Sequence, residues 1–280
     1  CGRRTVGVRR AGVKRPVLLI GAGRMGGALL KGWIEKGIGP LAVVEPAPSP
    51  HLRKLAKAGS IALFGRVAEL HGGVRACVVA LKPQVLKTQA ADLRAVAQTG
   101  ALMISIAAGT NLRALRAAWG REARIVRAMP NMPGAIGRGI SVLYAPSNIV
   151  RADRRLAESL LARLGETLWV GRESHIDAVT AISGSGPAYV FLLAEALEKA
   201  AIAEGLPGET AKRLARATVA GAGAMLDVEK REPAELRRDV TSPGGTTEAA
   251  LRILSGASGL SPLIARAVRA ATQRAEELAE

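Results

Sequence analysis

The strongest constraint on the fold is an alternation of two hydrophobic patterns between residue 16 and about residue 172. Short apolar runs predict strands that are buried on both faces of a parallel sheet. Longer segments with a period of about 3.6 residues, such as Met25 to Lys36 and Leu112 to Trp119, predict the intervening helices. This alternation is typical of an α/β fold with a doubly wound parallel sheet. The predicted strands are Val17 to Ile20, Leu41 to Val44, Ile61 to Phe64, Ala76 to Ala80, Leu102 to Ile106 and Arg124 to Arg127.

The second part of the chain has a different pattern. Two more apolar runs, Ile140 to Tyr144 and Thr167 to Val170, flank a predicted helix at Arg151 to Leu164 and are expected to extend the sheet. Beyond them the strand signal fades. We therefore expect one domain over residues 16–172 and an all-helical domain over residues 173–280.

The predicted helical domain is unusually apolar. Pro187 to Glu204 is predicted as a helix. Its N-terminal half, Ala188 to Ala196, is apolar on nearly all sides, so we expect this half of the helix to be buried. Ala211 to Leu226 is predicted as another helix, and Ser261 is expected to cap a last one with Pro262 at its first position. Because so apolar a helical segment needs a partner subunit to cover it, we predict a homodimer formed through this domain.

Charge makes nucleic acid the first partner to consider, since the formal net charge is +17. The basic residues are scattered between acidic ones, as in Arg151 to Arg163, and aromatic residues that could stack on bases make up only 2% of the chain. We expect no nucleic-acid partner, although a non-enzymatic nucleotide-sensing or nucleic-acid-binding protein remains an alternative. No stretch reaches the length of a membrane span, so no membrane partner is expected.

The N-terminal residues and the cysteines indicate the cellular compartment in which the protein is expected. Residues 1–15 are rich in arginine and are expected to form a disordered basic leader without the apolar stretch of a secretory signal. The chain has two cysteines, Cys1 and Cys77, and Cys77 lies within an apolar run. The absence of a disulfide framework favours a reducing compartment, and we expect the cytoplasm.

A glycine-rich loop follows the first predicted strand and opens the first predicted helix. In the sequence Gly21-Ala22-Gly23-Arg24-Met25-Gly26, the glycines allow a tight turn, close approach of a pyrophosphate and close helix–strand packing. The helix N-terminus supplies free N–H groups for the phosphates. This context predicts a Rossmann domain that binds NADH or NADPH.

The choice between the two cofactors stays open. Glu45 ends the second strand, where a carboxylate usually binds the ribose diol, and it would repel the 2′-phosphate of NADPH. Arg24, Arg53 and Lys54 could instead receive that phosphate. An ordinary carboxylate at a strand end is the alternative for Glu45.

Two later strand ends are further candidates for cofactor contacts. Ala80, Lys82 and Pro83 follow one strand, and Ala107 and Ala108 follow the next. Ligands of open parallel sheets lie at the carboxyl ends of strands, and small residues there leave room for a nicotinamide ribose. Taken alone, each segment is as consistent with a plain turn as with a site.

The most unusual stretch is Asp239 to Glu248, with the sequence DVTSPGGTTE. The Ser242 and Thr247 hydroxyls, together with the N–H groups of a helix that begins at Thr246 or Thr247, could hold a carboxylate. The alternative is a helix-capping loop with a threonine as N-cap.

An acid–base pair is missing from these motifs. The histidines His51, His71 and His175 match no metal-ligand spacing, so no metal site is expected. A hydroxy-acid dehydrogenase needs a base for the hydroxyl proton, and none is evident. A protonated cyclic imine is already electrophilic, so its reductase must mainly position it and hold its carboxylate.

These segments, in this order, resemble the pyrroline-5-carboxylate reductase family over residues 16–277. The glycine loop carries Arg24 where asparagine is frequent in the family, and the segment Arg127 to Pro133 carries Met132 where threonine is frequent. The alternative is a related two-domain NAD(P)-dependent hydroxy-acid dehydrogenase or an enzyme that uses an F420-type cofactor. The segments that carry the resemblance are Gly21 to Gly26, Ala80 to Pro83, Arg127 to Pro133, Ala178 to Tyr189 and Asp239 to Thr247.

The resemblance implies reduction of 1-pyrroline-5-carboxylate to L-proline by NADPH or NADH, in a cytoplasmic homodimer that assembles further into a decamer. It implies that Thr247 and Ser242 are catalytic and that Thr247 bonds the ring nitrogen. Substrate would be bound by Ser242, Gly245, Thr246 and Thr247. Cofactor would be bound by Gly21, Ala22, Gly23, Arg24, Met25, Gly26, Glu45, Ala80, Lys82, Pro83, Ala107, Ala108 and Asn131.

Overall fold

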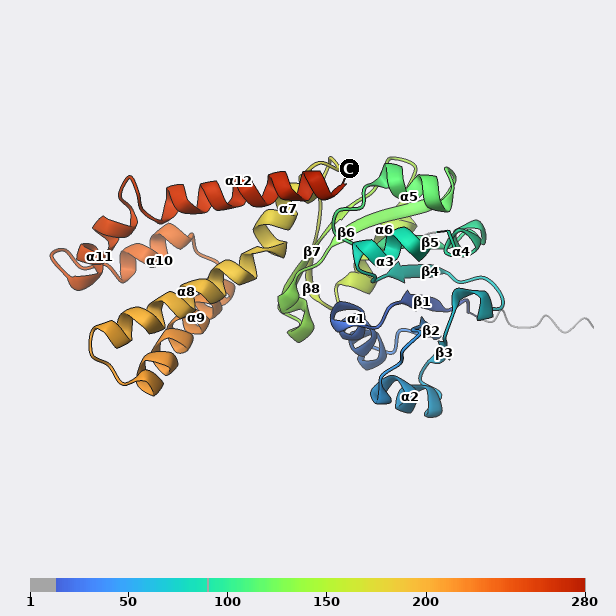
Figure 1. The fold of residues 1–280 in the computed structure, drawn as a ribbon, viewed down its shortest axis with the longest axis horizontal. Helices are drawn as coiled ribbons and strands as arrows, with labels where there is room; N and C mark the ends of the chain where they lie inside the picture. The colour runs from blue at the N-terminus through green and yellow to red at the C-terminus, as the bar shows by residue number, and fades with distance from the viewer. Residues whose placement is uncertain (1–13, 90, 280) are drawn as a thin grey trace, which may run out of the picture. The chain divides into compact units, whose positions relative to one another are not determined.

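The chain forms two compact units in the computed structural model, which describes residues 14–89 and 91–279 (Figure 1). The first unit runs to Ile176 and includes the chain's end from Leu278, and the second spans Asp177–Glu277. The predicted basic leader lies outside the described residues except for Lys14 and Arg15. The predicted domain boundary after residue 172 stays a prediction.

An eight-stranded sheet forms the centre of the first unit, in the order β3-β2-β1-β4-β5-β6-β7-β8 (Figure 1). Every apolar run predicted as a strand contributes one, so the predicted α/β class is confirmed. The strands are β1 Val17–Ile20, β2 Leu41–Val44, β3 Ala62–Phe64, β4 Ala76–Val79, β5 Leu102–Ser105, β6 Arg124–Met129, β7 Gly139–Tyr144 and β8 Gly165–Trp169.

One pairing differs from the fully parallel sheet that the pattern predicts. β7 runs antiparallel to β6, with Arg127 opposite Tyr144 and Met129 opposite Val142. The connection between them contains only the 3₁₀ turn η2, Met132–Ile136. A parallel return needs a crossover of about a dozen residues or more, so this short link permits only the antiparallel pairing.

The central strands β1, β2, β4 and β5 are buried on both faces, as their continuous apolar runs predict, whereas the edge strands β3 and β8 are partly exposed. In β1, Val17 and Leu19 belong to one hydrophobic cluster and Leu18 and Ile20 to another. Trp33 is fully buried in the first cluster, and its indole N–H donates to the Leu160 carbonyl at 2.9 Å. These clusters hold the carboxyl ends of the strands in fixed positions.

Helices cover both faces of the sheet. Helix α1 and helix α6 pack on the first cluster, while α3, α4 and α5 contribute to the second. Another 3₁₀ turn, η1, lies at Val67–Glu69. The helices of this unit are α1 Arg24–Glu35, α2 Pro50–Lys57, α3 Pro83–Gln89, α4 Arg94–Gln98, α5 Leu112–Trp119 and α6 Arg151–Leu161.

The second unit is helical throughout its described length, as predicted. Between α7 and α8 lies a π-helical turn, η3 at Thr180–Gly184, which the sequence pattern does not reveal. The Tyr189 hydroxyl donates to the Ala181 carbonyl at 3.1 Å and so braces this turn. The helices are α7 His175–Val179, which begins in the first unit, α8 Gly186–Ala203, α9 Gly208–Glu229, α10 Pro233–Asp239, α11 Thr246–Leu254 and α12 Leu260–Ala279.

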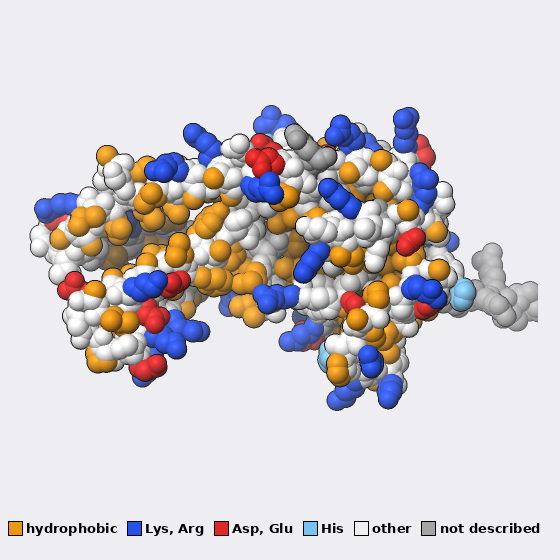
Figure 2. Space-filling model, in the orientation of Figure 1, with side chains coloured by type: hydrophobic (Ala, Val, Ile, Leu, Met, Phe, Trp, Pro, Cys, Tyr) orange, Lys and Arg blue, Asp and Glu red, His pale blue; other side chains and the backbone are white. Residues whose placement is uncertain are grey.

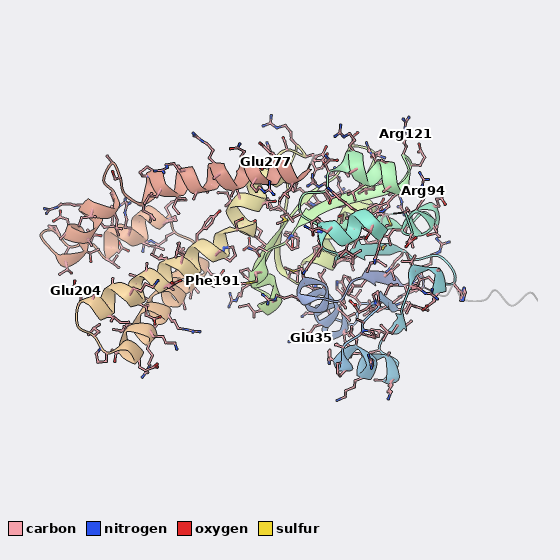
Figure 3. The ribbon with its side chains drawn as sticks, in the orientation of Figure 1. Glu35, Arg94, Arg121, Phe191, Glu204 and Glu277 are labelled. Atoms are coloured by element: carbon pink, nitrogen blue, oxygen red, sulfur yellow. The ribbon has the colours of Figure 1, made fainter. Side chains whose placement is uncertain are left out.

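The predicted burial of α8 is wrong for the single chain. None of its residues is buried, and Phe191 and Leu192 are 55% and 63% exposed. Figure 3 labels Phe191 on this helix, and Figure 2 shows hydrophobic side chains at the surface of the second unit. The other helices of this unit leave many apolar side chains of α8 exposed. A partner subunit would bury these side chains.

The expectation that no stretch has the length of a membrane span is also wrong. The helical segment His175–Ala203 is continuous through the π turn and has the length and apolarity of a span, although only by those two criteria. The predicted helix begins only at Pro187, so the prediction left out the helical residues before it and gave a helix that was too short.

The start of the last helix differs from the prediction that Ser261 caps it with Pro262 first. Helix α12 begins at Leu260. A turn closed by the Gly259 N–H and the Gly256 carbonyl precedes it, and the Gly259 carbonyl accepts from the Leu263 N–H. Gly259 therefore takes the capping position, and Pro262 is tolerated because its missing N–H lies within the first turn.

Candidate active site

The glycine loop has the backbone that a phosphate cradle requires. Gly21 has φ +84°, and a β-carbon there would lie 2.9 Å from the Ala80 carbonyl oxygen. A β-carbon on Gly26 would lie 2.1 Å from the Gly21 carbonyl oxygen. Both positions exclude any larger residue. At Gly23, by contrast, a β-carbon would meet open space, which leaves room for a ligand to approach the backbone.

Helix α1 presents its N-terminus at this loop. Gly23 is its N-cap, no side chain caps the helix, and its first turn contains no acidic residue. Its free N–H groups and the positive end of the helix dipole therefore favour an anion. A pyrophosphate group has the charge and the size for this place.

A cavity of about 310 Å³ lies beside the loop at the carboxyl ends of β1, β4, β5 and β6. This edge of the sheet is its topological switch point, because the chain turns from β1 toward β2 and later returns to add β4 on the other side of β1. Predicted cofactor residues from three separate segments of the chain meet here: Gly23, Arg24, Met25, Ala80, Lys82, Pro83, Ala107 and Ala108.

Some lining residues were missed by the sequence reasoning. Leu81, Ile106, Met129 and Pro130 also line this cavity. Each adjoins a predicted residue or the segment before Asn131, so extending each predicted strand end by one or two residues would have found them. They supply an apolar wall suited to one face of a nicotinamide ring.

Glu45 does not line the cavity but is bonded to the glycine loop itself. Its carboxylate accepts from the Ala22 N–H at 2.9 Å and from the Ala47 N–H at 3.3 Å. These bonds place the negative charge at the carboxyl end of β2 beside the loop. A phosphate group on an adjacent ribose would meet this charge.

Arg24 and Met132, the two positions that depart from the commonest family form, contact each other. The Arg24 guanidinium donates to the Met132 sulfur at 3.5 Å in an exposed contact. This long bond to a weak acceptor leaves the charge of Arg24 accessible to a ligand at the loop.

Asn131 has a structural contact that the sequence did not predict. Its side-chain oxygen accepts from the Ile140 N–H at 3.0 Å and so ties the segment after β6 to β7. A β-carbon on Gly139 would lie 2.7 Å from that oxygen, which explains the glycine at this position. Asn131 therefore fixes the backbone that carries Met129 and Pro130 to the cavity.

The second predicted constellation lies in the other unit and forms a tight turn before α11. The Gly245 N–H donates to the Ser242 carbonyl at 3.0 Å, and Gly244 has φ +71°. Helix α11 begins at Thr246, with Gly245 as its N-cap and no side-chain cap. The alternative of a threonine N-cap is therefore wrong, since the glycine takes that position.

The hydroxyl-bearing residues of this loop gather at the start of α11. Ser242 is exposed, and Thr246 and Thr247 occupy the first two helical positions. Glu248, which the sequence reasoning missed, accepts from the Gly244 N–H at 2.8 Å and from Arg252 at 3.3 Å. These bonds hold the loop in shape, and Arg252 offsets the charge of Glu248 beside the helix N-terminus.

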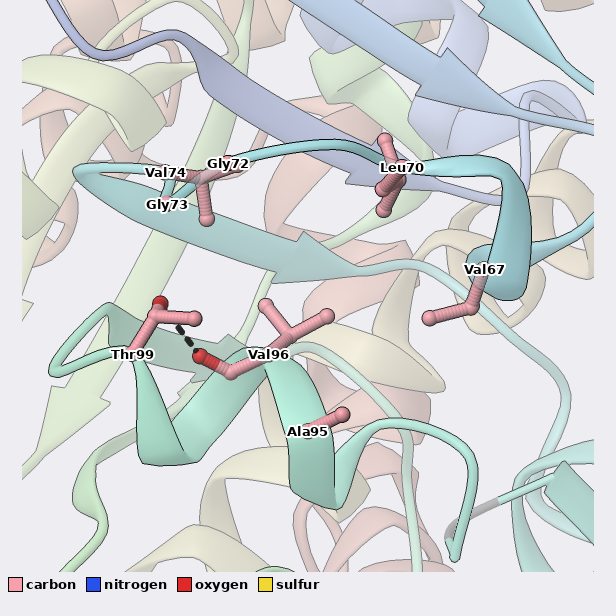
Figure 4. A pocket seen from close by; sticks show the side chains of 8 residues that line it. All are labelled: Val67, Leu70, Gly72, Gly73, Val74, Ala95, Val96 and Thr99. Carbon is pink, nitrogen blue, oxygen red and sulfur yellow. Dashed lines mark hydrogen bonds between the residues drawn. The ribbon is translucent and has the colours of Figure 1, made fainter.

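Two other features could mark candidate sites besides the glycine loop and the turn before α11: clusters of metal ligands and a further cavity. No group of three or more potential metal ligands occurs among residues 14–89 and 91–279. A further cavity of about 360 Å³ is lined by Val67, Leu70, Val96 and neighbouring residues, none of them predicted for the site (Figure 4).

Comparison with known proteins covers both units. A family model described as pyrroline-5-carboxylate reductase dimerisation matches residues 173–278, and one described as NADP oxidoreductase, coenzyme F420-dependent, matches residues 16–109. A pyrroline-5-carboxylate reductase of Pseudomonas aeruginosa is 40% identical over 265 residues, which are 94% of this chain and 97% of that protein. The chain belongs to the pyrroline-5-carboxylate reductase family.

Other members of the family agree with this placement. A pyrroline-5-carboxylate reductase of Glycine max is 36% identical and covers 92% of this chain and 94% of its own. A solved pyrroline-5-carboxylate reductase from Coxiella burnetii superimposes with a TM-score of 0.86 at 34% identity, over 96% of this chain and all of its own. A Plasmodium falciparum relative, solved with NADP bound, gives a TM-score of 0.80 at 27% identity and covers 96% of this chain and all of its own.

Membership confirms several predictions. The chain is an NAD(P)H-dependent oxidoreductase with a Rossmann domain and a helical dimerisation domain, and it forms a homo-oligomer. The predicted roles of individual residues are not tested by these similarities and are developed below as proposals.

Proposed function

We propose that this chain reduces 1-pyrroline-5-carboxylate to L-proline, with NADPH or NADH as the hydride donor, in the last step of proline biosynthesis. The observation that carries the proposal is the similarity to pyrroline-5-carboxylate reductases along nearly the whole chain, at 40% identity to one of them. The geometry of the glycine loop and of the turn before α11 supports it.

The cofactor site is proposed at the switch-point cavity. The N–H groups at the start of α1 would bind the pyrophosphate. Gly21 and Gly26 allow the close packing of loop, strand and helix that puts these N–H groups in place. Lys82, Pro83, Ala107 and Ala108 line the same cavity and would border the nicotinamide and its ribose. When bound there, the reduced nicotinamide supplies the hydride.

The substrate site is proposed at the turn before α11. The Ser242 hydroxyl and the N–H groups of Gly245, Thr246 and Thr247 would donate to the substrate carboxylate, because they converge at the positive end of α11. The Thr247 hydroxyl would bond the ring nitrogen and hold it protonated. The imine carbon gains the hydride, the C=N double bond becomes a single bond, and the nitrogen keeps its proton.

This division of roles needs no strong general base. A protonated imine already carries the positive charge that attracts hydride, so positioning supplies most of the rate enhancement. In a hydroxy-acid dehydrogenase, a lysine or histidine would have to remove a proton. Lys199, the lysine of α8, is exposed and ion-paired with Glu195 at 2.6 Å, which leaves that role without a candidate on this helix.

Transfer of deuterium tests the reaction directly. Reduced cofactor that carries deuterium at the transferable position should give proline with one deuterium on the former imine carbon, measured by mass spectrometry. Proline without deuterium, or a labelled hydroxy acid formed instead from a keto acid, would contradict the proposal. Fully labelled proline with only one of NADH and NADPH would identify the preferred cofactor.

We propose a homodimer formed through residues 173–280 and, from the family resemblance, a decamer built from five such dimers. The exposed apolar side chains of α8 and the match of this segment to a dimerisation model support the dimer. Light scattering coupled to size-exclusion chromatography distinguishes the two assemblies from a monomer.

We propose a cytoplasmic location without a nucleic-acid or membrane partner. Cys77 is a free buried thiol, and its burial raises its pKa far above the ordinary range, so that it stays protonated and inert. Such a thiol is compatible with a reducing compartment. Fractionation of cells that contain the tagged full chain checks the location, and recovery with membranes would contradict it.

A further inference from the structure

A second polar cavity lies at the edge of the sheet opposite to the cofactor cavity. It measures about 510 Å³, and its lining includes the basic side chains Lys14, Lys36, Arg75 and Arg163 together with Ser159. This volume falls within the range of small-molecule sites, about 300–1,000 Å³.

The four basic residues come from four separate segments. Lys14 precedes β1, and Arg75 directly precedes β4, so both lie at the amino-terminal ends of neighbouring parallel strands. Lys36 is the C-cap of α1, and Arg163 follows the end of α6. Because the glycine loop lies at the carboxyl ends of β1 and β4, this basic cavity is separate from the proposed cofactor site.

The backbone around the basic cavity is well fixed. The Arg75 N–H donates to the Pro16 carbonyl at 2.9 Å, and the Arg75 carbonyl accepts from the Leu102 N–H at 3.2 Å. On the other side, a β-carbon on Gly32 would lie 2.7 Å from the β-carbon of Arg163. The glycine in α1 thus lets the end of α6 approach closely and brings Arg163 beside Lys36.

The positive charges in this cavity are not balanced within the described chain. None of the described lining residues is acidic, and none of the four basic side chains has an ion pair among the described residues. The Nε atoms of Arg75 and Arg163 are buried without a hydrogen-bond partner among those residues. A buried donor without a partner destabilises the folded chain, and an anion in the cavity would supply the missing acceptor.

Helix ends explain only part of this arrangement. Cations favour the C-terminal ends of helices, which accounts for Lys36 and Arg163 without any ligand. Lys14 and Arg75 are not at helix ends, and the buried Nε of Arg75 gains nothing from a helix dipole. The other cavity near the amino-terminal ends of β4 and β5, shown in Figure 4, has no charged lining residue. The clustering of cations is therefore specific to the basic cavity.

We infer that the basic cavity binds a small phosphate-bearing anion, either free phosphate or a phosphate monoester. Arginine forks and lysine ammonium groups are suited to the several oxygens and the double charge of such a group. The Ser159 hydroxyl can add a further hydrogen bond. This inference concerns a site distinct from the proposed reaction and does not depend on it.

Thermal unfolding of the full chain tests the inference. The protein is saturated with NADP⁺ to fill the cofactor site, and its melting temperature is followed against inorganic phosphate and, separately, glycerol 3-phosphate, at constant ionic strength kept with potassium chloride. A ligand that binds only the folded state raises the free energy of unfolding by RT ln(1 + c/Kd), where c is the free ligand concentration, so the melting temperature keeps rising with the logarithm of ligand concentration above Kd. We expect a rise with one or both phosphates that follows this logarithmic dependence and exceeds the rise with chloride, and the phosphate with the lower fitted Kd identifies the source.

Matched variants locate the effect. Arg75→Gln and Arg163→Gln should each raise the fitted Kd for phosphate roughly tenfold, since each removes one charge-assisted bond. Arg121→Gln removes the same charge from an exposed position outside the cavity and should leave it unchanged (Figure 3). If Arg75→Gln does not fold, Arg163→Gln carries the test. No phosphate-specific rise, or an equal rise in all variants, would overturn the inference.

Discussion

Two adjacent glycines at the start of α1 differ in the space that surrounds them. A β-carbon on Gly26 would lie 2.1 Å from the Gly21 carbonyl oxygen, whereas one on Gly27 would lie 3.5 Å from the Ala22 oxygen, an ordinary contact. Gly26→Ala must therefore push α1 away from the loop and should weaken cofactor binding by tenfold or more, roughly 1.4 kcal/mol. Calorimetric titration with NADH and NADPH measures the change.

Gly27→Ala is the control for that prediction. It adds the same methyl group one position later and should leave cofactor affinity nearly unchanged while stabilising the helix by about 0.4–1 kcal/mol. Equal loss of affinity in the two variants would show that the loop does not act through close packing at Gly26.

Thr247 is the residue on which the proposed chemistry depends most. Thr247→Ala should lower turnover by about a hundredfold, because the hydroxyl that bonds the ring nitrogen is lost, while cofactor affinity stays within about twofold. Thr247→Ser should restore most of the turnover, and Thr99→Ala, in the first unit, should have no effect. Parallel loss of turnover and cofactor binding in Thr247→Ala would contradict a role confined to the substrate.

Glu45 is expected to set the choice of cofactor through its charge. Glu45→Gln keeps an oxygen that can accept from the Ala22 N–H but removes the negative charge beside the loop. Affinity for NADPH should rise by about tenfold, and affinity for NADH should change little. Unchanged NADPH affinity would show that the carboxylate lies too far from the 2′-phosphate to matter.

Among the elements of the first unit, β6 and the N-terminal end of α5 are linked through an ion pair that involves Glu173. Arg127 of β6 is 3% exposed and pairs with Glu173 at 2.7 Å, and Glu173 also accepts from the Leu112 N–H at 2.6 Å. Glu173→Ala leaves the Arg127 charge buried without its carboxylate and should lower the free energy of unfolding by about 3 kcal/mol. Denaturant unfolding measures it.

The matched change for this pair is Glu122→Ala, which removes an exposed carboxylate after α5. It should alter the free energy of unfolding by less than about 0.5 kcal/mol. A similarly small effect of Glu173→Ala would show that Arg127 finds another partner or water.

The central strands β1, β2, β4 and β5 were predictable from the sequence because they are buried on both faces and therefore read as uninterrupted apolar runs. β1 and β2 agree with their predicted bounds residue for residue. The antiparallel direction of β7 was not predictable from periodicity, since it depends on the length of the link through η2. The π turn at Thr180–Gly184 was missed because one extra residue shifts the helical period only locally.

The glycine loop was the part of the candidate site that the sequence predicted best, because there the backbone conformation itself forms the site. Gly21 and Gly26 have the close backbone contacts, and Gly23 the open space, that their spacing implies. The structural contact of Asn131 was not predictable, since its partner, Ile140, lies on another strand. The sequence also could not show that Glu45 bonds the loop, because that contact depends on the pairing of β1 and β2.

At the scale of the whole molecule, the exposed apolar side chains of α8 predict that the single chain is incomplete. Phe191→Glu places a charge on a surface that a partner subunit is proposed to cover and should shift the assembly toward monomer. Light scattering during size-exclusion chromatography measures the mass. Gln98→Glu adds the same charge to an exposed position on α4 and should leave the mass unchanged. An unaltered mass for Phe191→Glu would place the interface elsewhere.

The most direct test of the central claim is the oxidation of reduced cofactor in the presence of 1-pyrroline-5-carboxylate, followed by absorbance with NADH and NADPH in parallel. We expect rapid oxidation that depends on this substrate, with proline formed in equal amount to the cofactor consumed. No oxidation with either cofactor, from folded protein that still binds it, would contradict the assignment and favour a related two-domain hydroxy-acid dehydrogenase.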